Sequence, residues 1–171
     1  MFVLKDYIHI DAPLERCFLL STSLAIVERE LGMHPVAGAD ATRTSGLAVG
    51  GDRIRWEGWQ LGIPQYHVSL ISAFEPNRFF QDTMLAGRFK FFQHDHEFTE
   101  IDGQILLKDA IRFSMPLGFA GRMVGRYLLV PHIRGLMRRR FAMLKHIAET
   151  EEWRKYLPVG LTVFAALGNG K

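Results

Sequence analysis

Apolar and polar residues alternate along much of the chain, a period-two pattern typical of strands that bury one face. The pattern predicts strands over residues 2–10, 54–60 and 66–74, and three more between Phe79 and Pro116. Ala86-Gly87 and Asp102-Gly103 predict the turns inside that last stretch, because glycine-containing pairs favour tight hairpins. The sequence therefore predicts antiparallel pairing of neighbouring strands.

After the first predicted strand the pattern becomes helical. Asp11, followed by a proline and a glutamate, predicts a helix N-cap, and this helix is expected to end near Ser21. A second short helix is expected over residues 24–31, because Gly32 can end it. The segment from Met33 to about Thr42 is expected to be a loop.

From Leu117 to about Glu149 the apolar residues recur every three or four positions, which predicts one long amphipathic helix. Pro131 is expected to kink or split it, because the proline ring removes a hydrogen-bond donor and clashes with the preceding turn. The apolar positions are Phe119, Met123, Tyr127, Leu128, Ile133, Met137, Phe141, Leu144 and Ala148.

The order of these elements predicts an α+β fold, in which a curved antiparallel sheet of about seven strands wraps around the long C-terminal helix. The two short helices follow the first strand. Only the long helix is available to cover the concave face of the sheet. A helix that bridges such an opening leaves an internal cavity.

The Asp102-Gly103 turn fixes which residues of the last hairpin face each other. A two-residue turn pairs Ile101 with Gln104, and the other partners follow outward in step. The charged residues then share the outer face. The inner face carries Phe92, His94, His96 and Phe98 opposite Phe113, Ile111, Asp109 and Leu107, respectively.

His96 and Asp109 are expected to be in contact on this inner face, where the carboxylate can fix the tautomer of the imidazole and raise its pKa. Three interpretations are open. The pair is a satisfied polar contact inside a core, or it transfers protons as a general base. Alternatively His94 and His96 bind a metal ion, together with Asp109 or Asp82. We expect no metal, because spacing fixes no third ligand.

The neighbouring hairpin leaves its register open. A two-residue turn at Ala86-Gly87 places Gln81 opposite Phe92, whereas a three-residue turn places Asp82 there and adds a carboxylate to the His94 site. On an earlier strand Trp56 is expected to face the cavity. Trp59, three positions later, then faces outward.

Composition predicts one globular domain over residues 1–156, because a chain of 171 residues with 48% hydrophobic residues can bury a sizeable core. Cys17 is the only cysteine, so no intramolecular disulfide can form, and a buried reduced thiol is expected. No secretory signal and no membrane-spanning stretch is recognisable, so we expect a cytoplasmic protein. The apolar tail, residues 157–171, has no assigned place in this fold.

The net charge of +3 is concentrated in the long helix. Basic residues beside an apolar helix face attract anionic headgroups, so peripheral membrane contact is one hypothesis. Nucleic-acid binding is not expected, because no known nucleic-acid motif accompanies the charge. Phosphate-loop, dinucleotide and nucleophile-elbow motifs are also missing. The basic residues are Arg122, Arg126, Arg134, Arg138, Arg139, Arg140 and Lys145.

Four segments in order resemble the SRPBCC superfamily, the START and Bet v 1-like helix-grip proteins, especially its polyketide cyclase/dehydrase-like and coenzyme Q-binding branch. They are IDAPLERCF (10–18), EPNRFFQD (75–82), GRFxxFxHxHxF (87–98) and LxDxIxFxxP (107–116). The resemblance covers residues 2–150. It implies a helix-grip fold and a cavity for a hydrophobic ligand, and it favours Asp82 beside the His94 site. Such proteins share no single catalytic triad, and only some are enzymes.

We therefore expect binding or transport of a lipid, isoprenoid quinone or polyketide-like aromatic, without a cofactor. One alternative is a cyclase/dehydrase-type enzyme that uses the His96–Asp109 pair, with His94 as a further catalytic candidate. The other is a module that binds a partner or a membrane surface through the basic helix and the tail. The expected ligand-binding residues are Trp56, Asp82, Phe92, His94, His96, Phe98, Asp109, Ile111, Phe113, Met123, Tyr127 and Met137.

Overall fold

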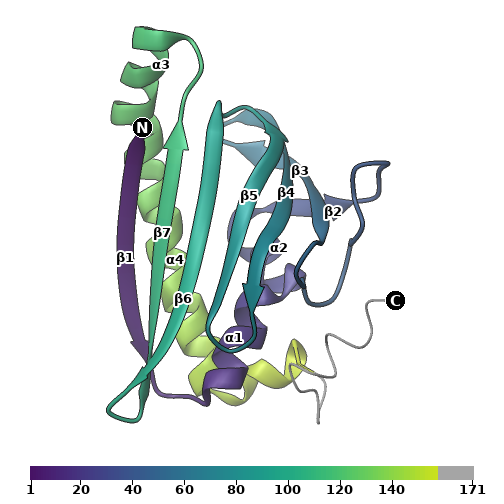
Figure 1. Ribbon diagram of the computed structural model, residues 1–171, viewed down its shortest axis with the longest axis vertical. Helices are drawn as coiled ribbons and strands as arrows, with labels where there is room; N and C mark the ends of the chain where they lie inside the picture. Colours follow the sequence, from purple (N-terminus) through teal and green to yellow (C-terminus); the bar gives the residue numbers. More distant parts are fainter. Residues whose placement is uncertain (158–171) are drawn as a thin grey trace.

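The computed structural model describes residues 1–157 and confirms the predicted α+β helix-grip architecture (Figure 1). Its strands are β1 (Phe2–Ile10), β2 (Met33–Val36), β3 (Arg53–Gln60), β4 (Ile63–Glu75), β5 (Phe79–Gly87), β6 (Phe91–Ile101) and β7 (Gln104–Ser114). Its helices are α1 (Leu14–Thr22), α2 (Leu24–Leu31), α3 (Gly118–Val124), the π-helical η1 (Gly125–Leu129), α4 (Val130–Glu149) and the 3-10 helix η2 (Glu151–Lys155). Apart from Leu157, the predicted apolar tail lies outside the described residues.

The strands form one antiparallel sheet in the order β1-β7-β6-β5-β4-β3-β2. Figure 1 shows α4 running along one face of this curved sheet, with α1 near the end where α4 finishes. Helix α4 contacts β1, α1 and α2. Because apolar residues of α4 and of the inner sheet face point toward each other, the interior lies between these two layers.

The β6–β7 hairpin has the predicted register. Ile101 pairs with Gln104, and the pairs continue without a shift through His96–Asp109 to the Phe91 end of the strand. Asp102 (φ 50°) and Gly103 (φ 77°) both have left-handed backbone conformations, as a two-residue hairpin turn of this kind requires. The turn residues therefore fix the position of His96 beside Asp109.

The β5–β6 hairpin has neither of the two registers that the sequence left open. Its strands end at Gly87 and begin again at Phe91, so the turn lies beyond Ala86-Gly87 and is wider than expected. Asp82 pairs with His94 rather than lying opposite Phe92. The shift brings the carboxylate directly beside the histidine pair.

Three local predictions were wrong in detail. Met33–Val36 is an edge strand rather than a loop, paired with β3. The β3–β4 connection is a two-residue turn at Leu61-Gly62, both in left-handed conformation, so β4 begins at Ile63. Asp11 does not cap α1. Its backbone N–H instead donates to the Glu149 side chain, which connects the start of the domain to the end of α4.

The long C-terminal helix is split as predicted. Regular α-helix stops at Val124, a π-helical turn covers Gly125–Leu129, and α4 begins at Val130 with Pro131 in its first turn. Because proline offers no N–H to a carbonyl one turn back, the chain must change its hydrogen-bond spacing just before it. Figure 1 shows α3 at the opposite end of the sheet from α1.

Two apolar clusters make up the core. The larger surrounds Phe18, which packs edge-on against Phe74, Phe80 and Phe98. The smaller surrounds Phe113, which stacks on Phe2 with ring centroids 5.0 Å apart. The clusters are separated along the sheet and α4, and the candidate site lies between them.

Candidate functional site

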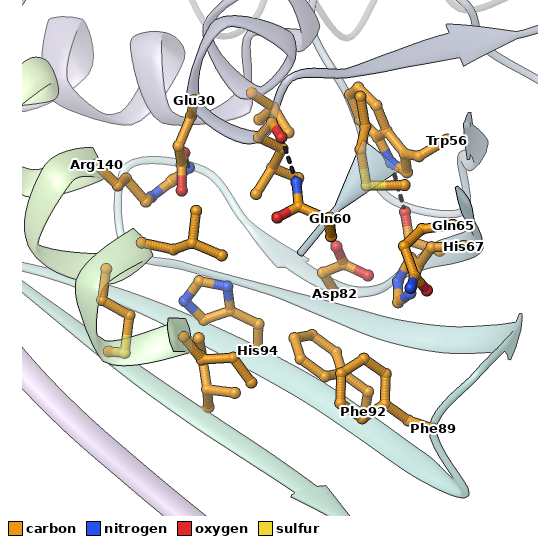
Figure 2. Close-up of a pocket in the computed structure, with 18 of the residues that line it drawn as sticks. Glu30, Trp56, Gln60, Gln65, His67, Asp82, Phe89, Phe92, His94 and Arg140 are labelled. Carbon is orange, nitrogen blue, oxygen red and sulfur yellow. Dashed lines mark hydrogen bonds and ion pairs between the residues drawn. The ribbon is translucent and has the colours of Figure 1, made fainter. Parts of the chain in front are cut away.

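A cavity of about 380 Å³ lies between the concave sheet face and helices α2 and α4 (Figure 2). Residues from both core clusters line it, so the cavity lies in the middle of the domain. Most of its lining is apolar. Its apolar residues include Leu24, Met33, Ile54, Trp56, Ile71, Phe80, Phe89, Phe92, Ile111, Met115, Ile133, Leu136 and Met137.

The cavity opens toward solvent between η1 and the β3–β4 hairpin. Five residues line the cavity and are also exposed to solvent. They are Val124 and Leu128 on one side, and Leu61, Ile63 and Tyr66 on the other. We call these five residues the mouth. Its apolar character means that an apolar molecule meets compatible side chains at the entrance as well as inside.

The sequence-predicted ligand residues divide into two groups. Seven line the cavity: Trp56, Asp82, Phe92, His94, His96, Ile111 and Met137. Five do not: Phe98, Asp109, Phe113, Met123 and Tyr127. Trp59, expected to face outward, is 67% exposed.

The five residues outside the lining have two different environments. Phe98, Phe113 and Asp109 are buried behind the cavity wall. Met123 of α3 and Tyr127 of η1 are instead exposed, at 41% and 67%. The opposite side of the α3–η1 segment packs on the domain. The buried positions there are Gly121 and Gly125, where an added Cβ would collide with the Pro116 carbonyl and the Phe2 ring. The expectation that Met123 and Tyr127 line the cavity is therefore corrected.

His94 and His96 both contact Asp109. His94 Nε2 lies 3.1 Å from one carboxylate oxygen, and His96 Nδ1 lies 2.8 Å from the other. Burial alone would raise the pKa of Asp109, but the nearby histidines hold that pKa far below its ordinary value. The carboxylate is therefore ionised and accepts both hydrogen bonds. Each histidine donates one N–H to Asp109, and the other ring nitrogen of each faces away from this carboxylate.

The predicted rise in the His96 pKa is wrong. Burial lowers the pKa of His96 to about 3, although Asp109 acts in the opposite direction. His96 also stacks on Phe80, with ring centroids 4.2 Å apart, which keeps water from the imidazole. Desolvation outweighs the carboxylate, so this imidazole is neutral at physiological pH.

Two buried charges missed by sequence reasoning complete the cluster. Arg140 on α4 donates to Glu30 on α2 (2.9 Å) and to the Ser21 carbonyl (3.4 Å), and its Nε lies 3.5 Å from Asp109. Burial acts to lower the pKa of Arg140, but the two carboxylates raise it above its ordinary value. Arg140 is therefore a fixed buried cation between α2, α4 and the sheet.

Asp82 faces His94 from the neighbouring strand (Figure 2). Its Oδ1 has no hydrogen-bond partner within residues 1–157. Burial raises the pKa of Asp82 to about 6, opposed by His94, Arg140 and a Ser69 hydrogen bond. The cavity thus has a polar end at which Asp82 Oδ1 is an acceptor without a hydrogen bond, and Arg140 Nε also makes none among the described residues. We call Glu30, Asp82, His94, His96, Asp109 and Arg140 the polar cluster.

The polar cluster includes three groups with metal-ligand spacing. The ligand atoms of His94, His96 and Asp109 all lie within 4.8 Å of one another. Arg140 already places a positive charge 3.5 Å from Asp109, however, and both histidine N–H groups are directed to that carboxylate. A cation would have to displace these interactions, so the donor set fits a hydrogen-bonded ion cluster better than a metal centre.

Five of the seven basic residues of the C-terminal helical region are exposed. Arg122, Arg126, Arg134, Arg138 and Arg139 are exposed, whereas Arg140 is buried and Lys145 pairs with Glu149. No acidic residue occurs between Asp109 and Glu149 in the sequence. The five exposed arginines, which we call the basic surface, are accompanied by exposed Leu117, Phe119, Met123 and Tyr127.

The helices described over residues 1–157 include none that is long and apolar enough to cross a membrane.

No protein-family model matches the sequence, and no curated protein is similar to it in sequence. Solved structures do match the fold. A START superfamily protein from Mycobacterium smegmatis aligns with a TM-score of 0.62 at 10% identity, over 85% of this chain and 98% of that one. Ara h 8.0201 aligns with a TM-score of 0.54 at 12% identity, over 84% and 97%. Aha1 from Colwellia psychrerythraea aligns with a TM-score of 0.58 at 14% identity, over 87% and 97%. At this identity the likeness establishes the fold.

Proposed function

We propose that this helix-grip protein of the START and Bet v 1-like type binds one hydrophobic small molecule in its internal cavity. The observation that carries the proposal is the space of about 380 Å³, lined mainly by apolar side chains, in the middle of the core. Small-molecule sites typically occupy a few hundred cubic ångströms and combine apolar walls with a few polar groups. The proposed ligand classes are a lipid, an isoprenoid quinone and a polyketide-like aromatic.

Native mass spectrometry of the protein purified from its own host tests this proposal. We expect a co-purifying apolar molecule at one copy per chain. Ala48 lines the cavity, so Ala48→Phe should exclude that molecule. Ala25 is exposed on α2, and Ala25→Phe should retain the molecule as a matched control. Equal occupancy of the two variants would contradict binding in the cavity.

A second proposed role is contact with an anionic membrane, and one observation favours it. The basic surface and its exposed apolar side chains lie on α3, η1 and α4. Val124 of α3 and Leu128 of η1 also belong to the mouth. A membrane against this region would face the entrance of the cavity. Each arginine near such a surface contributes about 1 kcal/mol.

Vesicle sedimentation tests this role. The double variant Arg122→Gln, Arg126→Gln should bind phosphatidylserine-containing vesicles at least about tenfold more weakly, on the same estimate of about 1 kcal/mol per arginine. The wild-type protein and the double variant should both bind neutral phosphatidylcholine vesicles weakly. Unchanged binding of the double variant to anionic vesicles would contradict the role.

The cyclase/dehydrase alternative rests on His96, whose Nε2 is a free acceptor that lines the cavity. Its lowered pKa makes it a weak base, which favours binding over catalysis. If the protein were such an enzyme, His96→Ala would abolish turnover of a cavity-bound substrate and leave its binding intact.

A further inference from the structure

At the polar end of the cavity, more hydrogen-bond acceptors than donors are available to a ligand. Most of its donors are already used within the protein. Trp56 donates to Ser69, Thr22 to Leu19 and Ser21 to Cys17, while Arg140 donates to Glu30 and to the Ser21 carbonyl. Arg140 Nε makes no hydrogen bond among the described residues, but it lies 3.5 Å from the Asp109 carboxylate. A ligand that offers only acceptors, such as a carbonyl or a carboxylate, therefore finds few available donors at this end.

The acceptors, by contrast, are free. Asp82 lines the cavity, and its Oδ1 has no partner among the described residues. In its neutral form His94 donates through Nε2 to Asp109 and carries a lone pair on Nδ1. Two acceptors on paired positions of β5 and β6 thus face the same space (Figure 2).

We infer that the ligand is an amphiphile whose polar group is a hydrogen-bond donor, a phenol or alcohol hydroxyl that binds the Asp82 carboxyl and His94 Nδ1. The apolar body lies toward the mouth, between Phe92 and Met137. This inference rests on the proposed function and narrows it. A hydroxyl-bearing aromatic or a reduced quinol satisfies the site, whereas an oxidised quinone or a fatty acid carboxylate does not.

A hydrogen bond to a charged group contributes more than one between neutral groups, about 1.5–3 kcal/mol. Loss of the donor from an otherwise similar ligand should therefore weaken binding about tenfold or more. A buried acceptor left without a donor adds to this difference, because it loses its water and gains no partner.

Calorimetric titration at pH 8 with two probes tests the inference. The probes are 2-naphthol, which has a hydroxyl donor, and 2-methoxynaphthalene, which has the same ring system and no donor. We expect the wild-type protein to bind 2-naphthol at least about tenfold more tightly. In Asp82→Leu the two affinities should come within about threefold of each other, with the ether bound no more weakly than by the wild-type protein.

Asp82→Asn provides a second variant that preserves shape and introduces an amide donor. It should reduce the preference for 2-naphthol and improve binding of 2-acetylnaphthalene, whose carbonyl accepts a hydrogen bond. Asp102→Asn is the matched control, because Asp102 lies in the β6–β7 turn, far from the cavity lining. It should bind all three probes as the wild-type protein does.

The outcomes separate this inference from the proposed function. If the wild-type protein binds all three probes with similar affinity, or if the preference for 2-naphthol persists in Asp82→Leu, the hydroxyl inference fails and the binding function stands. If no probe binds to the ligand-free protein, both fail.

Discussion

Asp82 keeps its proton to a higher pH in the folded protein than in the unfolded chain. Its folded pKa is about 6, and an unperturbed aspartate titrates near pH 3.9. The folded state binds more protons between these values, so this residue destabilises the fold increasingly as pH rises through that window. Above pH 6 the full penalty is present. The same carboxylate that offers an acceptor to a ligand thus reduces stability at neutral pH.

Asp82→Asn should therefore stabilise the ligand-free protein more at pH 7.5 than at pH 5. We expect the gain in the free energy of unfolding to be larger by about 1 kcal/mol at the higher pH, because the amide carries no charge to desolvate. Urea unfolding at the two pH values measures it, with Asp102→Asn as the control. A gain independent of pH would show that Asp82 is not protonated near pH 6 in the folded state.

Arg140 neutralises two buried carboxylates, those of Glu30 and Asp109. Arg140→Met keeps much of the side-chain volume but leaves both carboxylates without their cation, which should cost about 3–5 kcal/mol. The neighbouring Arg139 is exposed, so Arg139→Met should change stability by less than about 0.5 kcal/mol. Chemical denaturation of the two variants measures the difference. Similar effects would mean that the buried ion cluster contributes little to stability.

At the scale of elements, the close contact of α3 with the Met115–Pro116 segment depends on a missing side chain. A Cβ at Gly121 would collide with the Pro116 carbonyl oxygen, a backbone atom that cannot rotate away. Gly121→Ala should therefore destabilise the protein by about 1–3 kcal/mol despite the better helix propensity of alanine.

Gly135 in α4 is the matched control for that prediction. A Cβ there meets nothing closer than the end of the flexible Arg139 side chain, at 3.5 Å. Gly135→Ala should then be neutral or stabilise by up to about 1 kcal/mol. Thermal unfolding of both variants gives the comparison. Equal effects of the two substitutions would contradict the close packing of α3.

The sequence predicted strand pairing best where the residues of the turn determine the register. Asp102-Gly103 permits only one register for the β6–β7 hairpin, and that register placed His96 beside Asp109. The β5–β6 turn has no such pair at its tip, so its register could not be derived. Met123 and Tyr127 were assigned to the wrong side because helical periodicity identifies an apolar stripe, whereas in this helix the buried stripe is glycine.

The polar cluster was only partly predictable. His94, His96 and Asp109 follow from one hairpin, but Glu30 and Arg140 come from two helices whose docking the sequence does not specify. One clue existed for Arg140. It lies three residues after Met137 and four before Leu144, which places it on the buried face of its helix rather than among the exposed arginines.

At the scale of the whole molecule, the cavity separates two apolar clusters that a filled core would join. Side chains around an empty space lose dispersion contacts, so an occupant should stabilise the entire domain. At 100 times its dissociation constant a ligand adds about 2.7 kcal/mol, which for a chain of this size raises Tm by about 5–10 °C.

Differential scanning calorimetry of ligand-free protein, with and without 2-naphthol, measures this shift. Ala25→Phe should show the same increase in Tm as the wild-type protein, and Ala48→Phe should show almost none. An equal shift in both variants would place the binding site outside the cavity.

The strand order has a consequence for synthesis. Strand β1 pairs with β7, so Phe2 lies against Phe113 although most of the domain separates them in sequence. Pairings between such distant segments slow folding, because the loop between them must first close. During synthesis β1 therefore waits for β7, and until they pair the apolar face of β1, which includes Leu4, is exposed to aggregation.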